Sequence, residues 1–335
     1  MTGRIVILGA GAIGCFVGGN WTAAGLEATL IGRPGTRDEI AAGGMRLTDG
    51  AGLDLRLAAA DVDFATSPEA LAGAGLVVVT VKGPATGEAA AQIAPHAPAE
   101  AAVLSLQNGI SHIDTLRTAL PGRRVLRGIV GFNVARLGPG HWHRGTSGLL
   151  MAERGAQIER LAERLAGSPC ALMPTDDAEG VAWGKLVLNL NNAVNALSGR
   201  TLRAELSERS YRRVLAASMR EALEVLAAAG TRPARVTALP PRLLPGFIGA
   251  PDAIFNTIGL RLQKIDAHAR SSMADDFAAG RGTEIDFLNG EIVGLAGRTG
   301  REAPVNRRIV ELVKEAESGG RRGWSGAELA AAVLG

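Results

Sequence analysis

The chain has 335 residues, of which 47% are hydrophobic and 21% charged, so it is long enough to form two domains with apolar cores. Its 36 basic and 33 acidic residues leave a net charge of only +3, and no basic run with interleaved aromatic residues suggests nucleic-acid binding. Two cysteines cannot form a disulfide framework, and we see neither a signal peptide nor an apolar run of membrane-spanning length. We therefore expect a cytoplasmic protein that binds neither nucleic acid nor membrane.

The first half of the chain alternates short apolar runs with Ala-rich segments. Strands are predicted at residues 4–8, 28–31, 76–81, 102–106 and 125–133, and helices at 14–24, 67–71, 86–93, 111–120 and 156–166. Gly138-Pro139-Gly140 is followed by strand-like residues 141–151, which suggests an antiparallel hairpin. Short apolar strands between helices are typical of a parallel sheet covered on both faces. We predict an α/β domain over residues 1–174.

The pattern changes near Pro174, after which almost only helical periodicity remains. Helices are predicted at about 178–199, 205–229, 251–268, 284–299 and 304–317, with prolines interrupting the middle. We therefore predict an all-α second domain over residues 175–318. The tail, residues 319–335, ends in a short Ala-rich helix to which the sequence assigns no role.

A GxGxxG motif follows the first predicted strand. Gly9, Gly11 and Gly14 provide the glycines, and Ala12 and Ile13 lie between the last two. The motif opens a helix, and a second strand comes about 15 residues later, which is the context of a dinucleotide-binding fingerprint. The phosphates would bind the free N–H groups at the start of the helix. The alternative is an ordinary Gly-rich turn. We predict a Rossmann-type, doubly wound sheet that binds a dinucleotide.

The end of the second predicted strand indicates which dinucleotide is bound. An NAD enzyme usually has an acidic residue there, whereas this chain has Arg33. An arginine can pair with a 2′-phosphate, which an acid would repel. The alternative is a solvated loop arginine, and Arg37 is a second candidate contact. We predict NADPH/NADP⁺ as the cofactor.

Lys82 and Asn108 each follow a predicted central strand. Residues at the carboxyl ends of such strands face the ligand crevice of an open α/β sheet. Asn108 could therefore bind the cofactor ribose or a substrate. The alternative for both is turn chemistry, because Asn-Gly is a common turn pair.

The predicted helix at 178–199 is strongly apolar but carries Lys185 and several asparagines. Lys185, Asn189 and Asn192 fall within about 60° of one another on a helix, with Asn195 further round the same side. A buried lysine tends to have a lowered pKa and can donate a proton to a carbonyl oxygen. The alternatives are an exposed stripe or asparagines that fix domain packing.

A second polar cluster comprises Ser271 and Ser272, followed by Thr283 and Glu284. Thr283 is predicted to cap a helix with Asp286 three residues on, so a capping role alone could explain the acidic residues. The residues themselves leave this question open.

Together these motifs resemble the ketopantoate reductase (2-dehydropantoate 2-reductase) family in order and approximate spacing. The resemblance covers about residues 4–317. It rests on Gly9–Gly14, Val81-Lys82, Gln107-Asn108-Gly109, Trp183-Gly184-Lys185 with Asn189, Ser271-Ser272-Met273 and Thr283-Glu284-Ile285-Asp286. It implies an NADPH-dependent reductase of a small 2-oxo acid, with the active site in the cleft between two domains, and a product that feeds coenzyme A synthesis.

The resemblance also implies roles for single residues. Lys185 resembles the family's general acid, and Glu284 the carboxylate that binds the substrate hydroxyl and supports the lysine. Ser272 resembles the group that holds the substrate carboxylate, and Asn108 and Asn189 resemble substrate-positioning amides. The implied NADPH contacts are Gly9, Gly11, Ala12, Ile13, Gly14, Arg33, Lys82 and Asn108.

Two positions depart from the family pattern. Ala193 and Ala269 stand where the family commonly has asparagine, and Asn192 or Asn195 could supply the first amide instead. These changes leave open a reductase of another 2-oxo acid. A β-hydroxyacid dehydrogenase usually has its asparagine three residues after the lysine, not four as here. A non-catalytic NADP sensor would not need Lys185 with Glu284.

Two further expectations concern metals and partners. His141 and His143 would point to one face of a strand, but with no further ligands in view we expect no metal site. The expected partners are the 2-oxo acid and, as an open option, a second copy of the chain in a homodimer.

Overall fold

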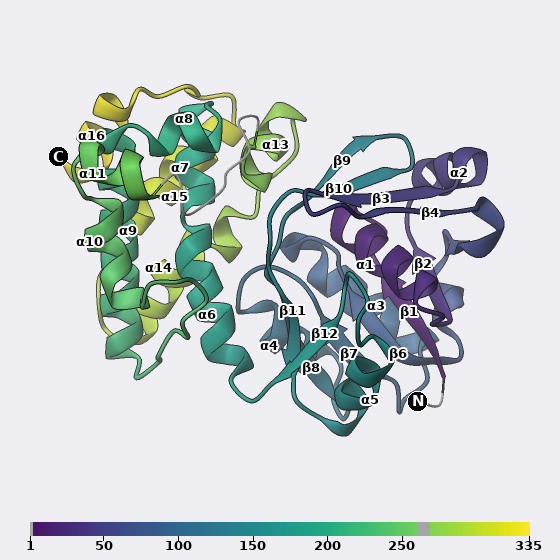
Figure 1. Cartoon of the computed structure of the whole chain (residues 1–335). Coiled ribbons are helices and arrows are strands. Elements are labelled where there is room, and N and C mark those ends of the chain that lie inside the picture. Colours follow the sequence, from purple (N-terminus) through teal and green to yellow (C-terminus); the bar gives the residue numbers. More distant parts are fainter. Residues whose placement is uncertain (1–2, 260–268) are drawn as a thin grey trace. The chain divides into compact units, whose positions relative to one another are not determined.

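The computed structural model describes residues 3–259 and 269–335. The chain forms two compact units, Met1–Ala178 and Glu179–Gly335, which are described separately (Figure 1). The C-terminal half of the helix predicted at 251–268 lies outside the described residues. Its first half forms a short helix, α11 (Asp252–Ile254), and a π-helical turn at Phe255–Gly259.

Unit 1 is built on an eight-stranded sheet, in the order β12-β11-β8-β7-β6-β1-β2-β5. Neighbouring strands are parallel except β8 and β11. The bounds are β1 Arg4–Leu8, β2 Ala28–Ile31, β5 Asp63–Ala65, β6 Ala74–Val79, β7 Ala102–Ser105, β8 Val125–Val130, β11 Leu150–Glu153 and β12 Leu172–Thr175. The predicted parallel α/β sheet is confirmed.

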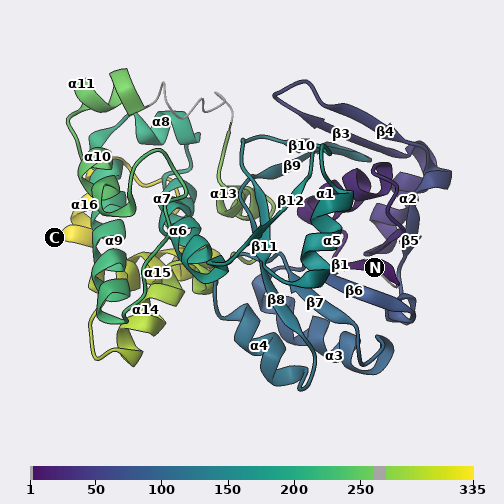
Figure 2. The ribbon, with the colours of Figure 1, turned by 60° about the horizontal axis from the view of Figure 1, so that its bottom comes forward.

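Helices cover both faces of this sheet because successive residues of its central strands point to opposite sides. Ile5 and Ile7 of β1 pack in one core with α1 (Ala12–Ala23) and α5 (Ala156–Arg164). Val6 and Leu8 pack in a second core with α3 (Thr86–His96) and α4 (His112–Ala119). Figure 2 shows α3 and α4 together on the face away from α1.

A second sheet, which the sequence pattern did not predict, packs on α1. Its order is β4-β3-β10-β9, and its strands are β3 Met45–Asp49, β4 Asp54–Leu57, β9 Val134–Gly138 and β10 His141–Arg144. A Cβ on Gly18 would lie 2.8 Å from the Cδ1 of Ile7 in the main sheet, and one on Gly19 would lie 2.8 Å from the Cδ1 of Leu47 in the second. Small residues on two sides of α1 therefore let both sheets approach it.

The predicted hairpin around Gly138-Pro139-Gly140 exists, but it joins β9 (Val134–Gly138) to β10 (His141–Arg144), not the strand at 125–133 to residues 141–151. The strand at 125–133 ends at Val130. It pairs antiparallel with β11, which lies further along the chain. Gly131 and Gly148 make a close backbone approach here, which glycines without a Cβ permit.

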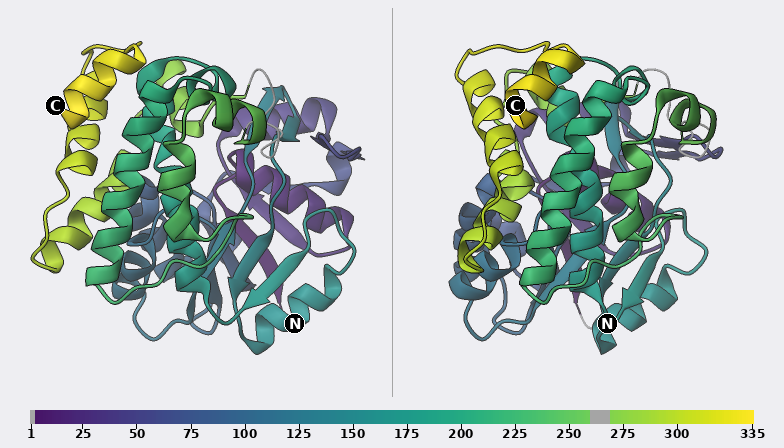
Figure 3. Two further views of the ribbon diagram at one scale, coloured as in Figure 1. Left: turned by 60° about the vertical axis from the view of Figure 1, so that its left-hand side comes forward. Right: turned by 90° about the vertical axis from the view of Figure 1, so that its left-hand side faces the viewer.

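Unit 2 is helical, as predicted (Figure 3). The helix predicted at 304–317 has the predicted bounds, whereas the other predicted helices are shorter or divided. Leu190 separates two helices in the segment 178–199, and the segment 205–229 likewise contains two. The helices not yet named are α6 Ala178–Asn189, α7 Asn191–Ser198, α8 Leu202–Leu206, α9 Arg209–Ala228, α10 Leu244–Ile248, α13 Ser272–Ala278, α14 Asn289–Arg298, α15 Pro304–Glu317 and α16 Gly326–Leu334.

The tail is part of unit 2, because α16 packs against α9. Within residues 3–259 and 269–335, none of the helices combines the length and apolar character that crossing a bilayer requires.

Candidate active site

The glycine motif forms a tight turn between β1 and α1. Gly9 has a φ of +114°, and a Cβ there would lie 2.7 Å from the backbone nitrogen of Val81. A Cβ on Gly14 would lie 2.7 Å from the Thr80 hydroxyl and closer still to the Gly9 carbonyl. That hydroxyl donates a hydrogen bond to the same carbonyl at 2.7 Å. Gly9 and Gly14 are therefore required for the turn itself.

Gly11 differs from these two glycines, because a Cβ there would meet no atom within 4 Å. Gly11 is exposed, and Ala12 and Ile13 are half-buried. Gly11 caps α1 without a side-chain hydrogen bond, and no acidic residue lies in the first turn. The positive end of α1 is thus open to an anion, and the residues present fit the pyrophosphate of a dinucleotide.

Arg33 lies two residues after the end of β2 and directly precedes α2 (Pro34–Gly43). Its side chain is exposed. Its guanidinium makes no hydrogen bond or ion pair with any residue that the structure describes. Arg37, in contrast, donates two hydrogen bonds to Asp38, at 2.9 and 2.7 Å. Of the two arginines, Arg33 is better placed to bind a phosphate.

Lys82 and Asn108 follow β6 and β7, which are neighbours in the sheet. Lys82 is exposed and Asn108 half-buried. A buried polar chain joins the two turns: the Gln107 amide donates to the Thr86 hydroxyl at 2.7 Å, and that hydroxyl donates to the Gly83 carbonyl at 2.7 Å. Unit 1 thus brings Lys82, Asn108 and the glycine turn to one edge of the sheet, where the parallel strands β1, β6 and β7 end.

In unit 2, the residues of the predicted polar stripe are divided between two helices, with Lys185 and Asn189 on α6 and Asn192 on α7. Lys185, Asn189 and Asn192 are half-buried, whereas the neighbours of Lys185 in the sequence, Gly184 and Leu186, are buried. Gly184 is needed because a Cβ there would collide with the carbonyl oxygen of Ala234. The segment around Ala234 therefore covers α6 beside the lysine.

The environment of Lys185 changes its acidity. Burial disfavours the charged ammonium and lowers the pKa of Lys185 from 10.5 to about 8. The carboxylate of Glu284 has the smaller, opposite effect of raising this pKa. Lys185 and Glu284 therefore interact electrostatically within unit 2.

Helix α15 holds the loop that carries Glu284 on both sides. The backbone N–H of Thr283 donates to Glu317 Oε1 at 2.7 Å, and Lys314 Nζ lies 2.7 Å from Asp286 Oδ1. The prediction that Thr283 caps a helix was wrong. Its hydroxyl accepts from the N–H of Ile285 at 3.2 Å and supports a 3₁₀ turn, and α14 begins only at Asn289.

The serine cluster is attached to α7. Ser271 is buried and caps α13, its N–H donates to Asn195 Oδ1 at 2.9 Å, and its hydroxyl donates to the Asn192 carbonyl at 3.0 Å. Ser272, the next residue, is exposed. Asn195 is fully buried and committed to this contact, so the expectation that its amide could serve a substrate was wrong.

Glu205, which the sequence pattern did not single out, is fully buried on α8. Asn191 and Asn195 donate to Glu205 Oε2 at 3.2 and 3.4 Å, whereas Oε1 has no partner among the described residues. Burial raises the pKa of Glu205 from 4.5 to about 8, against the two amide hydrogen bonds. The run of asparagines in the sequence could have suggested a buried partner of this kind.

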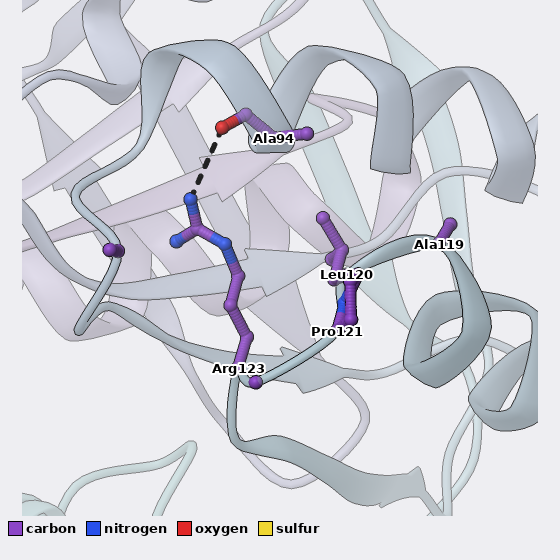
Figure 4. Close-up of a pocket in the computed structure, with 7 residues that line it drawn as sticks. Ala94, Ala119, Leu120, Pro121 and Arg123 are labelled. Carbon is purple, nitrogen blue, oxygen red and sulfur yellow. Dashed lines mark hydrogen bonds between the residues drawn. The ribbon is translucent and has the colours of Figure 1, made fainter.

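Two other features lie apart from these residues. His141 and His143 both hydrogen-bond the Thr48 hydroxyl, at 2.9 and 2.8 Å, so they point to one face of β10. A surface hollow lined by Leu120, Pro121 and Arg123 lies at the amino ends of β7 and β8, away from the glycine turn (Figure 4). The Arg123 guanidinium there binds carbonyls at the end of α3, including that of Ala97 at 2.8 Å.

Comparison with known proteins identifies the family. Residues 5–155 match the model of the family described as ketopantoate reductase PanE/ApbA, and residues 177–317 match the model of its C-terminal domain. The chain belongs to the ketopantoate reductase family. It is therefore an oxidoreductase acting on CH–OH groups, of a family that uses a nicotinamide cofactor.

Individual members of the ketopantoate reductase family are similar along nearly the whole chain. The 2-dehydropantoate 2-reductase of Halobacterium salinarum is 28% identical, over 95% of this chain and all of that one. The crystal structure of a PanE/ApbA family ketopantoate reductase from Ralstonia eutropha is 32% identical. It has a TM-score of 0.79 and covers 94% of this chain and 99% of that one.

The fold is also shared with a D-mandelate dehydrogenase whose structure contains NADH and anilino(oxo)acetate. That protein is 20% identical and has a TM-score of 0.75, with 94% of this chain and 99% of that one covered.

Proposed function

We propose that the chain reduces 2-dehydropantoate to (R)-pantoate with NADPH, a product that would feed pantothenate and coenzyme A synthesis. The observation that carries the proposal is Lys185, an ammonium with a pKa of about 8 on a mostly apolar helix. Such a group is charged at neutral pH but releases its proton readily, as a general acid must. The family membership supports the same reaction.

The proposed cofactor site is the edge of the sheet in unit 1. The first turn of α1 would hold the pyrophosphate, with Gly11 leaving room for it and Lys82 nearby as a cation. Arg33 would pair with the 2′-phosphate, which is why we propose NADPH and not NADH. When bound, the reduced nicotinamide supplies a hydride to C2 of the 2-oxo acid.

The proposed chemistry of the protein is proton donation and substrate orientation. As the new C–H bond forms at C2, Lys185 Nζ donates a proton to the carbonyl oxygen, which becomes the hydroxyl of the product. Glu284 keeps the lysine charged and would accept a hydrogen bond from the primary hydroxyl of the substrate. Ser272 would bind the substrate carboxylate.

Amide side chains complete the proposed substrate site. Asn189 of α6 and Asn192 of α7 are both partly exposed, as Lys185 is, so both would donate hydrogen bonds to substrate oxygens. Asn108 of unit 1 is proposed to contact both the cofactor ribose and the substrate.

A second candidate is the reduction of another 2-oxo acid on the same residues. Ala193, at a position where the family commonly has asparagine, is fully buried, so it offers neither a polar group nor an exposed surface to a substrate. Ala269 likewise has no polar side chain, and its carbonyl accepts from the N–H of Leu202 at 2.8 Å. The proposed substrate site therefore lacks the two asparagines that the family pattern has at these positions.

A turnover panel distinguishes these candidates. NADPH oxidation is followed with 2-dehydropantoate, with 2-oxo acids that lack its primary hydroxyl, and with arylglyoxylates. The proposal predicts the highest kcat/KM for 2-dehydropantoate, since only that substrate offers a primary hydroxyl to Glu284. A higher value for another acid supports the second candidate, and no oxidation with any acid contradicts both.

A further inference from the structure

The C-terminal tail lies beyond the family match, which ends at residue 317, but it is firmly docked in unit 2. The hydroxyl of Tyr211 on α9 donates to the Trp324 carbonyl at 2.6 Å. Ser325 and Glu328 form a capping box at the start of α16, and Leu329 is fully buried. The tail is therefore a packed part of the unit.

The tail contacts the end of α7. The backbone N–H groups of Gly323 and Trp324 both donate to the Leu197 carbonyl at 3.0 Å. Leu197 lies in the last turn of α7, where carbonyls have no partner within the helix. The tail thus provides hydrogen-bond donors for a carbonyl at the end of α7, the helix that also carries Asn192 and Asn195.

Arg322 connects the tail to α13. Its Nη1 donates to the Phe277 carbonyl at 3.0 Å, and its guanidinium lies 4.5 Å from the centre of the Phe277 ring. Its Nε and Nη2 donate to the carbonyl of Ala316 on α15, at 3.3 and 3.1 Å. One side chain therefore ties the last turn of α13 to the end of α15.

Helix α13 depends on such contacts because it has only seven residues. A helix this short is unstable by itself in water. Its first turn is fixed to α7 through Ser271, and its last turn is fixed by Arg322. Ser272, which we propose as the binder of the substrate carboxylate, lies between these two attachments.

We propose that Arg322 is a positioning residue for Ser272, and that the tail, residues 319–335, holds α13 in place. This inference rests on the proposed function for the role of Ser272. Loss of Arg322 leaves the last turn of α13 held by fewer contacts, so Ser272 is displaced more often from its binding position. The cofactor residues of unit 1 are unaffected.

The neighbouring Arg321 provides a matched control. Its guanidinium pairs with Glu328 and lies 4.3 Å from the centre of the Trp324 ring. Both contacts are within the tail, and Arg321 has no hydrogen bond to α13 among the described residues. Arg321→Met and Arg322→Met therefore remove the same charge one residue apart, but only the second removes contacts with α13.

The test measures KM for the 2-oxo acid and for NADPH in the full-length wild type and both variants. Arg322→Met should raise KM for the 2-oxo acid roughly fivefold or more, while KM for NADPH changes less than about twofold. The first change corresponds to the loss of about one net hydrogen bond at the substrate site, and the second to no loss at the cofactor site. Arg321→Met should change neither. Equal KM changes in both variants, or an unchanged KM for the acid in Arg322→Met, would overturn the proposal.

Hydrogen exchange of the backbone amides provides a readout that needs no substrate. The amides of residues 273–278 should exchange faster in Arg322→Met than in Arg321→Met. Equal protection in the two variants would overturn the proposal that Arg322 holds α13. If the wild type reduces no 2-oxo acid, the proposed function fails, but the exchange comparison still decides whether Arg322 holds α13.

Discussion

The carboxylate of Glu284 raises the pKa of Lys185, against the larger effect of burial, which lowers this pKa to about 8. The two residues come from α6 and from the 3₁₀ turn before α14, about a hundred positions apart in the sequence. The balance makes the ammonium more acidic than an exposed lysine while keeping it mostly charged near neutral pH. This relationship leads to the first prediction.

The reduction should lose activity as the pH rises through about 8. Only the protonated lysine can donate a proton, so kcat/KM should fall above the pKa of Lys185. Glu284→Gln removes the charge that raises this pKa, and the fall should begin at lower pH. Asp286→Asn, on the same turn but paired with Lys314, should leave the profile unchanged. A profile that Glu284→Gln does not shift would contradict the assignment.

Two glycines of the turn should differ in their effects, since Gly14 is needed for stability and Gly11 for NADPH binding. Gly14→Ala places a Cβ against the Gly9 carbonyl and the Thr80 hydroxyl, so it should destabilise the protein by about 1–3 kcal/mol. Gly11→Ala meets no protein atom within 4 Å, so it should keep the wild-type Tm but weaken NADPH binding. Thermal melts and titrations of NADPH fluorescence measure the two effects. Equal NADPH affinity in Gly11→Ala and the wild type would exclude this site.

Cofactor preference should depend on Arg33. Replacing it with Ala removes the proposed partner of the 2′-phosphate, so KM for NADPH should rise about tenfold or more while KM for NADH changes little. Arg37→Ala is the control, because that guanidinium is already paired with Asp38. A wild type that prefers NADH would show that the proposed phosphate contact is wrong.

Glu205 should make stability depend on pH. Its pKa is about 8 in the folded protein and about 4.5 in the unfolded chain, so the folded state binds the proton more tightly. Between pH 4.5 and about pH 8, the free energy of unfolding should fall as the pH rises. The contribution of Glu205 to this fall is about 1.4 kcal/mol per pH unit. Glu205→Gln keeps a neutral polar group and should remove that part of the slope. Denaturant unfolding at pH 5 and pH 8 tests this, and equal slopes in the two proteins would show that Glu205 titrates normally.

Those parts of the fold that depend on local pattern were predicted from the sequence. Strands β1 and β2 have the predicted bounds, because their apolar runs end at glycines or charged residues. The second sheet was missed because β4 (Asp54–Leu57) alternates exposed and half-buried residues, and β3 owes its burial to α1. Such strands are stabilised by tertiary contacts that no local pattern reports.

The candidate site shows the same limit. The 3.6-residue period predicted one shared side for Lys185, Asn189 and Asn192, and the structure leaves all three partly exposed, although Leu190 divides them between two helices. The period could not indicate that Asn195 turns inward to hold Ser271, nor that Glu205 lies beneath it. Buried polar contacts depend on which helices meet, and that is decided by the packing of the whole unit.

The most direct test of the account is NADPH oxidation in the presence of 2-dehydropantoate by the wild type and by Lys185→Ala. We predict turnover by the wild type and a loss of roughly 10²–10⁴-fold in kcat for the variant, because removing a general acid has effects of that size. NADPH binding should be retained in the variant. A Lys185→Ala protein with wild-type kcat would contradict the role of Lys185, and with it the proposed mechanism.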